Sequence, residues 1–315
     1  MTRALTHALL IVAIGLAVVP VDLSGQVAGV TQPGPQDEPI FRSRADFVSV
    51  DVAVWRGGSP VRGLGPDDFI VHDGGVPQRL QSVSMEEVPI DVTMFVDTSG
   101  SLSDLREGLA RDVERIFRLL RPMDRLRVLT LGYQVHDVFG WRSAGQAVAF
   151  DLPPVGRISA VYDALWLALL RKPEPGRRHL IIALTDGDDW SSVTTSQTLL
   201  EATARSESVL HIVRLPSVSS DRGRPWQWSA VRPDAEGQQR LRDAAAQTGG
   251  RLHQAASAGQ PVVDAFARAF DDFRRSYVLR YSYSGPAFAG WHEIDVRINR
   301  PDRYTVRARR GYVAP

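Results

Sequence analysis

Two patterns of hydrophobic residues alternate along the 315-residue chain. Between residues 41 and 88, apolar and polar positions alternate, as at Val48, Val50, Val52 and Val54, which is typical of short antiparallel strands with one buried face. The same two-residue period returns after residue 275, in SYVLRYSY, WHEIDVRI and YTVRARRGYV. The pattern therefore predicts β-structure at both ends of the folded part of the chain.

Between these ends, continuous apolar runs alternate with stretches of helical spacing, which indicates a mostly parallel sheet covered by helices. The residues from Leu105 to Leu120 place apolar side chains on one helical face and pairs of opposite charge on the other. Strands are predicted at residues 91–97, 125–133, 178–186 and 208–215, with a weaker one at 251–254, and further helices at 161–170, 238–247 and 262–274. The expected fold class is α/β, with a Rossmann-like, doubly wound sheet.

The two β-rich ends are interpreted as parts of one domain. Each end alone has about three strands, too few to bury two faces. We expect the ends, residues 41–88 and 276–315, to pair into one small antiparallel β-sandwich, with the α/β domain of residues 89–275 inserted between them. The alternative is an independent hairpin domain at each end.

The N-terminus has the features of an export signal. Arg3 precedes an apolar run at residues 8–19 that is short for a membrane span, and small residues suitable for cleavage follow by residue 28. Residues 29–40, rich in proline and glycine, are typical of a linker. We expect an exported protein, periplasmic or extracellular, with no stable membrane span once a signal peptide of residues 1–28 is removed. An uncleaved anchor is the alternative.

Composition excludes some classes of function. A formal net charge of +1 gives no broad attraction to nucleic acid, so no nucleic-acid partner is expected. The chain has no cysteine, which excludes disulfides, thiolate metal sites and a lipid-modified cysteine.

Oxygen-bearing side chains gather in three loops of the α/β part. Asp97, Ser99 and Ser101 follow one buried strand in VDTSGSLSD, Asp186 follows another in IIALTDGDD, and Ser159 begins a helix in GRISAVYDAL. Ligands of open parallel sheets bind beyond the carboxyl ends of the strands. Hydroxyls and carboxylates suit hard cations such as Mg²⁺. Helix capping by the serines is the alternative, but it does not explain three loops together.

The segment Asp97-Thr98-Ser99-Gly100-Ser101 resembles the Asp-x-Ser-x-Ser signature of von Willebrand factor type A (VWA) domains. The resemblance implies a metal-ion-dependent adhesion site (MIDAS), completed by Asp186 and by Ser159, which stands where family members often have threonine. Serine keeps the hydroxyl but loses the methyl that restricts its rotamer. In such sites an acidic group of a protein partner completes the coordination of the cation. The flanking segments resemble those of exported bacterial VWFA-related proteins.

The expected function is therefore binding and not catalysis: an exported protein that holds a divalent cation, Mg²⁺ first and Mn²⁺ or Ca²⁺ as alternatives, and docks a carboxylate of a protein partner. Trp190, Trp226 and Trp228 are candidate partner contacts, or else a local hydrophobic plug. Asp188 and Asp189 are interpreted as supporting or solvated residues. A structural scaffold with a weak or vestigial metal site is one alternative. A hydrolase using Ser99 or Ser101 is another, although zinc-protease, nucleophile-elbow and phosphate-loop motifs are absent from the sequence.

Overall fold

The computed structural model describes residues 47–85, 87–132, 134–144, 146, 152, 159–216, 235–286 and 289–314. The predicted signal peptide and linker, and the predicted partner contacts Trp226 and Trp228, lie outside these residues. Within the described part of the chain, no helix has the length and apolar character needed to cross a membrane.

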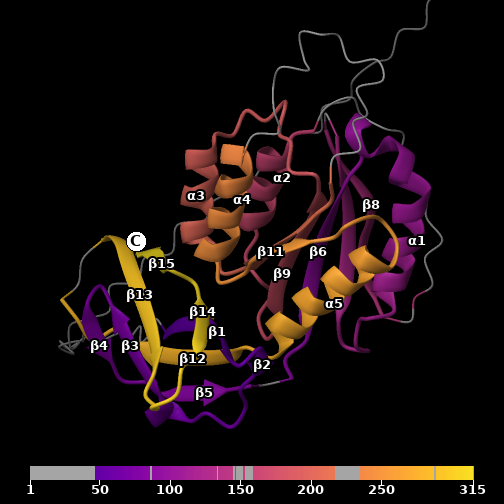
Figure 1. Ribbon diagram of the computed structural model, residues 1–315. Coiled ribbons are helices and arrows are strands. Elements are labelled where there is room, and N and C mark those ends of the chain that lie inside the picture. Colours follow the sequence, from indigo (N-terminus) through magenta and orange to yellow (C-terminus); the bar gives the residue numbers. More distant parts are fainter. Residues whose placement is uncertain are drawn as a thin grey trace, which may run out of the picture. The chain divides into compact units, whose positions relative to one another are not determined.

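The middle of the chain forms a six-stranded, mostly parallel sheet (Figure 1). The spatial order is β11-β10-β9-β6-β7-β8, so the chain starts in the interior at β6, builds outward through β7, and then crosses back to β9 on the other side. Every residue of β6 is buried, as expected for a central parallel strand. The strands are Ile90–Asp97 (β6), Arg125–Leu131 (β7), Val135–Ser143 (β8), Arg178–Thr185 (β9), Val209–Arg214 (β10) and Leu252–Gln254 (β11).

Helices cover both faces of this sheet (Figure 1). The helices α1 (Arg106–Phe117) and α5 (Gln260–Arg274) pack on one face, where they share a core with Val92, Met94 and Val96 of β6. The opposite face, with Phe95, is covered by α2 (Val161–Leu169), α3 (Ser196–Arg205) and α4 (Ala235–Gln247). The prediction of a doubly wound α/β sheet is confirmed.

Strands from the two chain ends pair with each other in two antiparallel sheets. One has the order β14-β1-β12-β5, with β2 on β1, and the other the order β15-β13-β3-β4. They enclose a common core that includes Val50, Leu279 and Tyr281. The shared β-sandwich is therefore confirmed, and the alternative of separate hairpin domains is wrong. The strands are Phe47–Arg56 (β1), Ser59–Pro60 (β2), Phe69–Asp73 (β3), Val76–Gln78 (β4), Ser82–Ser84 (β5), Tyr277–Ser282 (β12), Gly290–Ile298 (β13), Thr305–Ala308 (β14) and Gly311–Ala314 (β15).

A buried polar cluster joins these two sheets. Asp73 of β3 is fully buried and accepts hydrogen bonds from the hydroxyls of Tyr281 (2.8 Å) and Tyr312 (3.0 Å). Its other carboxylate oxygen lies 2.8 Å from Nδ1 of His292. One carboxylate from the N-terminal part thus satisfies three side chains from the C-terminal part.

Three features of the structure were not predicted. The edge strand β8, antiparallel to β7, has mostly exposed or half-buried residues and so gives no apolar run. The helix α3 is short and buries mainly small side chains. The segment YTVRARRGYV, predicted as one strand, divides at Arg309–Arg310 into β14 and β15, which belong to different sheets. Because the alternation of apolar and polar residues continues through the change of sheet, the sequence pattern does not show where one strand ends and the next begins.

Candidate metal centre

Asp97 is the last residue of β6 and its carboxylate is fully buried. One oxygen accepts a hydrogen bond from the backbone N–H of Ser99 (2.9 Å), and the other accepts one from the hydroxyl of Thr185 (2.7 Å). The parallel register of β6 and β9, in which Val96 lies beside Leu184, places Thr185 next to Asp97. The sequence alone does not predict this role of Thr185, because the last threonine of an apolar strand gives no sign of which neighbour it contacts.

Asp186 follows β9 directly and brings a second buried carboxylate to the same edge of the sheet. Its Oδ1 accepts a hydrogen bond from the backbone N–H of Asp188 (3.1 Å), while its buried Oδ2 has no partner among the described residues. Burial and, second, the charge of Asp186 raise the pKa of Asp97 to about 7. The two acids therefore repel each other in a site that excludes water.

Ser159 lies directly before α2 and is fully buried. Its hydroxyl donates to the backbone carbonyl of Asp188 (2.7 Å), so a hydrogen bond sets its rotamer and leaves the oxygen lone pairs for another partner. Ser99 is also buried, beside Asp97. Ser101 lies in the short 3₁₀ helix Gly100–Leu105, and its side chain is outside the described part of the chain.

Contacts therefore connect the described members of the predicted site. Ser99 and Thr185 contact Asp97, Asp186 lies close enough to raise the pKa of Asp97, and Asp188 joins Asp186 to Ser159. The three loops, far apart in sequence, meet at the carboxyl edge of β6 and β9.

Other acids hold the loop that carries Asp186. Asp189 accepts hydrogen bonds from the backbone N–H of Val161 (2.7 Å) at the start of α2 and from the hydroxyl of Ser192 (2.7 Å). Asp163 of α2 accepts from the backbone N–H groups of Val193 (3.0 Å) and Thr194 (2.7 Å). These contacts fasten the loop to α2, which is a supporting role.

The chemistry of the site fits a hard divalent cation. Two buried carboxylates, one with an unpartnered oxygen, form no ion pair within the described residues. The side chain of Arg214 donates only to the backbone carbonyl of Asp186 (3.0 Å). Carboxylate and hydroxyl oxygens are the ligands that Mg²⁺, Mn²⁺ and Ca²⁺ prefer. A cation here would compensate the negative charge that burial makes costly.

A second buried cluster has ligand-type side chains but does not suit a cation. Potential ligand atoms of His211, His253 and Asp272 lie within 4.8 Å of one another. The imidazoles hydrogen-bond to each other (2.8 Å), and Asp272 lies against the guanidinium groups of Arg251 (2.8 Å) and Arg307 (3.0 Å). Burial lowers the pKa of His253 to about 3 and that of His211 well below its usual value. The two arginines already supply positive charge, so we assign this cluster to packing.

No family model matches the chain, and no curated protein matches it. Solved structures are similar at low sequence identity. The ArnB paralog VWA2 from Sulfolobus acidocaldarius is 9% identical, with a TM-score of 0.46, over 84% of this chain and 75% of the other. A von Willebrand factor type A structure from Catenulispora acidiphila is 11% identical, with a TM-score of 0.41, over 86% and 75% of the two chains.

A third similar structure is proximal thread matrix protein 1 from the mussel byssus, with a zinc-occupied MIDAS motif. It is 12% identical, with a TM-score of 0.42, over 65% of this chain and 50% of the other. Structures named as VWA domains are therefore among those that this α/β chain resembles.

Proposed function

We propose that this protein binds a divalent cation through Asp97, Ser99, Ser101, Ser159 and Asp186 and uses it to dock an acidic group of a protein partner. The observation that carries the proposal is the pair of buried carboxylates of Asp97 and Asp186, in which Oδ2 of Asp186 has no hydrogen-bond partner among the described residues. A buried carboxylate oxygen without a partner costs free energy unless something positive meets it. The ligand set is the one that the VWA resemblance implies.

The combination of two charged carboxylates with neutral hydroxyls among the proposed ligands supports the docking of a partner carboxylate. Two carboxylates balance the charge of a divalent cation, and neutral serine hydroxyls add ligand atoms without further charge. The bound cation would supply an electrophilic position for an incoming carboxylate. On ligand hardness Mg²⁺ is our first choice, with Mn²⁺ and Ca²⁺ as alternatives.

The loop after β9 offers apolar contacts to a partner. Trp190 is 36% exposed and Val193 is 92% exposed. Trp190 donates its backbone N–H to the carbonyl of Ser159 (3.0 Å), which ties this loop to the site. Exposed tryptophan side chains close to a docking site are typical interface anchors. We propose the same role for Trp226 and Trp228, and a periplasmic or extracellular location from the N-terminal sequence.

The affinity for the cation is expected to depend on pH through Asp97. Burial and Asp186 raise the pKa of Asp97 to about 7, and a cation must displace that proton. The apparent affinity for Mg²⁺ should therefore be constant above about pH 8 and fall about tenfold per pH unit below pH 7. Calorimetric titration of Mg²⁺ across this range, in buffers of different ionisation enthalpy, measures both the affinity and the proton released. Saturable binding with no change of affinity between about pH 8 and pH 5.5 would contradict this proton competition.

Ser159 gives a second test. Replacing Ser159 with alanine removes a hydroxyl without adding charge and should weaken Mn²⁺ binding about tenfold. The matched control is Ser192→Ala in the loop after β9, because the Ser192 hydroxyl contacts Asp189 and the backbone N–H of Asp163 but not Asp188. Its affinity should stay close to that of the wild type. Equal losses in the two variants would mean that the loop, and not the Ser159 oxygen, determines the affinity.

No observation favours the hydrolase alternative. Where the histidines form side-chain hydrogen bonds in the described part, His179 contacts Thr93 and Ser208, His211 contacts His253, and His292 contacts the Asp73 cluster.

A further inference from the structure

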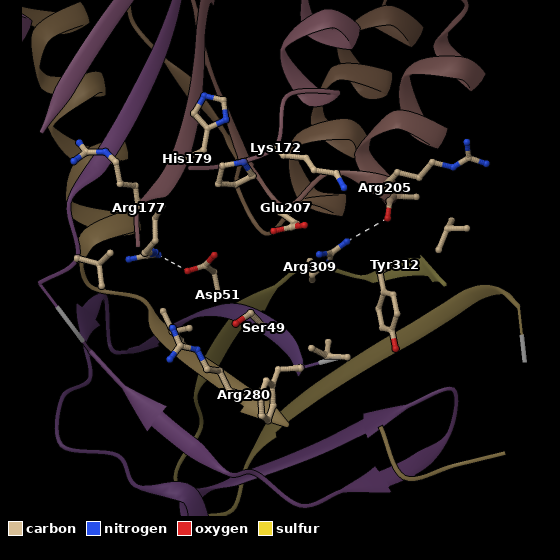
Figure 2. Close-up of a pocket in the computed structure, with 18 of the residues that line it drawn as sticks. Ser49, Asp51, Lys172, Arg177, His179, Arg205, Glu207, Arg280, Arg309 and Tyr312 are labelled. Atoms are coloured by element: carbon tan, nitrogen blue, oxygen red, sulfur yellow. Dashed lines mark hydrogen bonds and ion pairs between the residues drawn. The ribbon is translucent and has the colours of Figure 1, made fainter. Parts of the chain in front are cut away.

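A large cleft lies at the amino ends of the strands of the α/β sheet, whereas the metal centre lies at their carboxyl ends. Its volume is about 1350 Å³, and its lining includes residues of β1 and β12 on one side and the amino end of β9 on the other (Figure 2). Tyr312 of β15 and the side chain of Arg309 also face it (Figure 2). None of the proposed metal ligands contributes to this lining.

The lining of the cleft has an excess of positive charge. Two of its arginines are neutralised, since Arg177 pairs with Asp91 and Arg178 with Asp51. Glu207 is the remaining acid of the lining, because Glu87 pairs with Arg121. Four cations of the lining form no ion pair within the described residues: Lys172, Arg205, Arg280 and Arg309. Such an excess stands out in a chain whose formal net charge is +1.

Arg309 is the most enclosed of these four cations. Its guanidinium donates to the backbone carbonyls of Gly311 (3.0 Å) and Ala204 (3.2 Å), and the second of these bonds is drawn in Figure 2. Burial lowers its pKa, and the negative charges of Asp51 and Glu207 compensate its charge only in part. A carboxylate entering the cleft would complete this compensation.

The cleft also borders a strand edge. β12 pairs with β1 from Phe47 to Val52, but on the other side of β1 the strand β14 pairs only with residues 52–55. After β14 ends, the chain turns away from β1 at Arg309 and continues into β15, which pairs with β13 instead. No described strand therefore covers the edge of β1 from Phe47 to Asp51. Val48, whose side chain packs against the sandwich core, is also among the residues that line the cleft. An open strand edge accepts an extended peptide through main-chain hydrogen bonds.

We propose that this cleft binds an extended acidic segment of a protein partner, which adds to the open edge of β1 and places its carboxylates against Lys172, Arg280 and Arg309. The positive charge selects the acidic side chains, and the strand edge selects a peptide over other anions. This surface is separate from the metal centre and needs no cation.

The proposal is tested with a fluorescent ten-residue peptide of alternating glutamate and threonine, by anisotropy in buffer without divalent cations. The double variant Lys172→Glu/Arg280→Glu changes two exposed side chains that form no ion pair within the described residues. It should weaken binding about tenfold or more. The control Arg111→Glu/Arg118→Glu makes the same change of charge on exposed positions of α1 and beyond its end, and should bind nearly as the wild type does. The variant Asp97→Asn should also bind normally.

Hydrogen exchange identifies the binding edge. The amides of residues 47–51 should exchange more slowly when the peptide is bound. The proposal is overturned if the peptide does not bind, if both double variants lose affinity equally, or if Asp97→Asn abolishes binding. Binding of inorganic polyphosphate as tight as that of the peptide, with unchanged exchange at residues 47–51, would identify a general anion site and would also overturn it.

Discussion

Replacing Asp97 with asparagine is expected to lower the affinity of the protein for Mg²⁺ and Mn²⁺ by about 100-fold or more. Asparagine has nearly the same shape but carries no negative charge, so it cannot balance a cation. Asp97 is fully buried and lies beside Asp186, and both carboxylates are needed to neutralise a divalent ion there. The loss should therefore come from charge and not from altered packing.

Calorimetric titration of Mg²⁺ and Mn²⁺ into wild-type and variant protein measures this loss. The matched control is Asp189→Asn, since Asp189 accepts hydrogen bonds from the backbone N–H groups of Val161 and Tyr162 at the start of α2, and the amide oxygen of asparagine can accept the same bonds. Circular dichroism and thermal unfolding show whether each variant is folded. Wild-type affinity in folded Asp97→Asn would contradict the proposed site, and loss of affinity in Asp189→Asn would make Asp189 part of it. A folded wild type that binds neither ion would favour the scaffold alternative.

Replacing Asp73 with alanine is expected to lower the free energy of unfolding by about 3 kcal/mol or more. The change leaves the buried hydroxyls of Tyr281 and Tyr312 and the imidazole of His292 without their common acceptor. Because Asp73 belongs to the N-terminal part and its partners to the C-terminal part, the loss measures how strongly the two chain ends depend on each other.

Urea unfolding followed by circular dichroism checks this value. The control is Asp137→Ala, which breaks an ion pair with Arg127 in which Asp137 is 51% exposed, and it should cost less than about 1 kcal/mol. A loss in Asp73→Ala no larger than in this control would mean that the cluster is not needed to join the two sheets.

The sequence contained enough information to predict the class of the fold. All eight residues of β6 are buried, and most of them are apolar. Such an apolar run followed by an amphipathic helix is typical of a parallel sheet covered by helices. The return of the two-residue period after residue 275 predicted the pairing of the ends, because β1 and β12 each need a partner strand. An edge strand such as β8 is not predicted in this way, because many of its residues face solvent and it has no continuous apolar run.

The candidate site was predictable only in part. Asp97 and Asp186 follow apolar strands, so their place at the sheet edge follows from topology. The hydrogen bonds of Thr185 and of the Ser159 hydroxyl depend on strand register and on the course of the loop after β9, which no local pattern encodes. The basic cleft brings together residues as distant as Lys172 and Arg280, and only the folded chain places them in one lining.

Anomalous diffraction from crystals soaked in MnCl₂ tests the central claim most directly, because it locates the ion without assuming its ligands. We predict one strong peak in contact with oxygens of Asp97, Ser99, Ser159 and Asp186, at the carboxyl ends of β6 and β9. A peak between His211 and His253 instead, or a fully occupied manganese site elsewhere with none at Asp97, would contradict it.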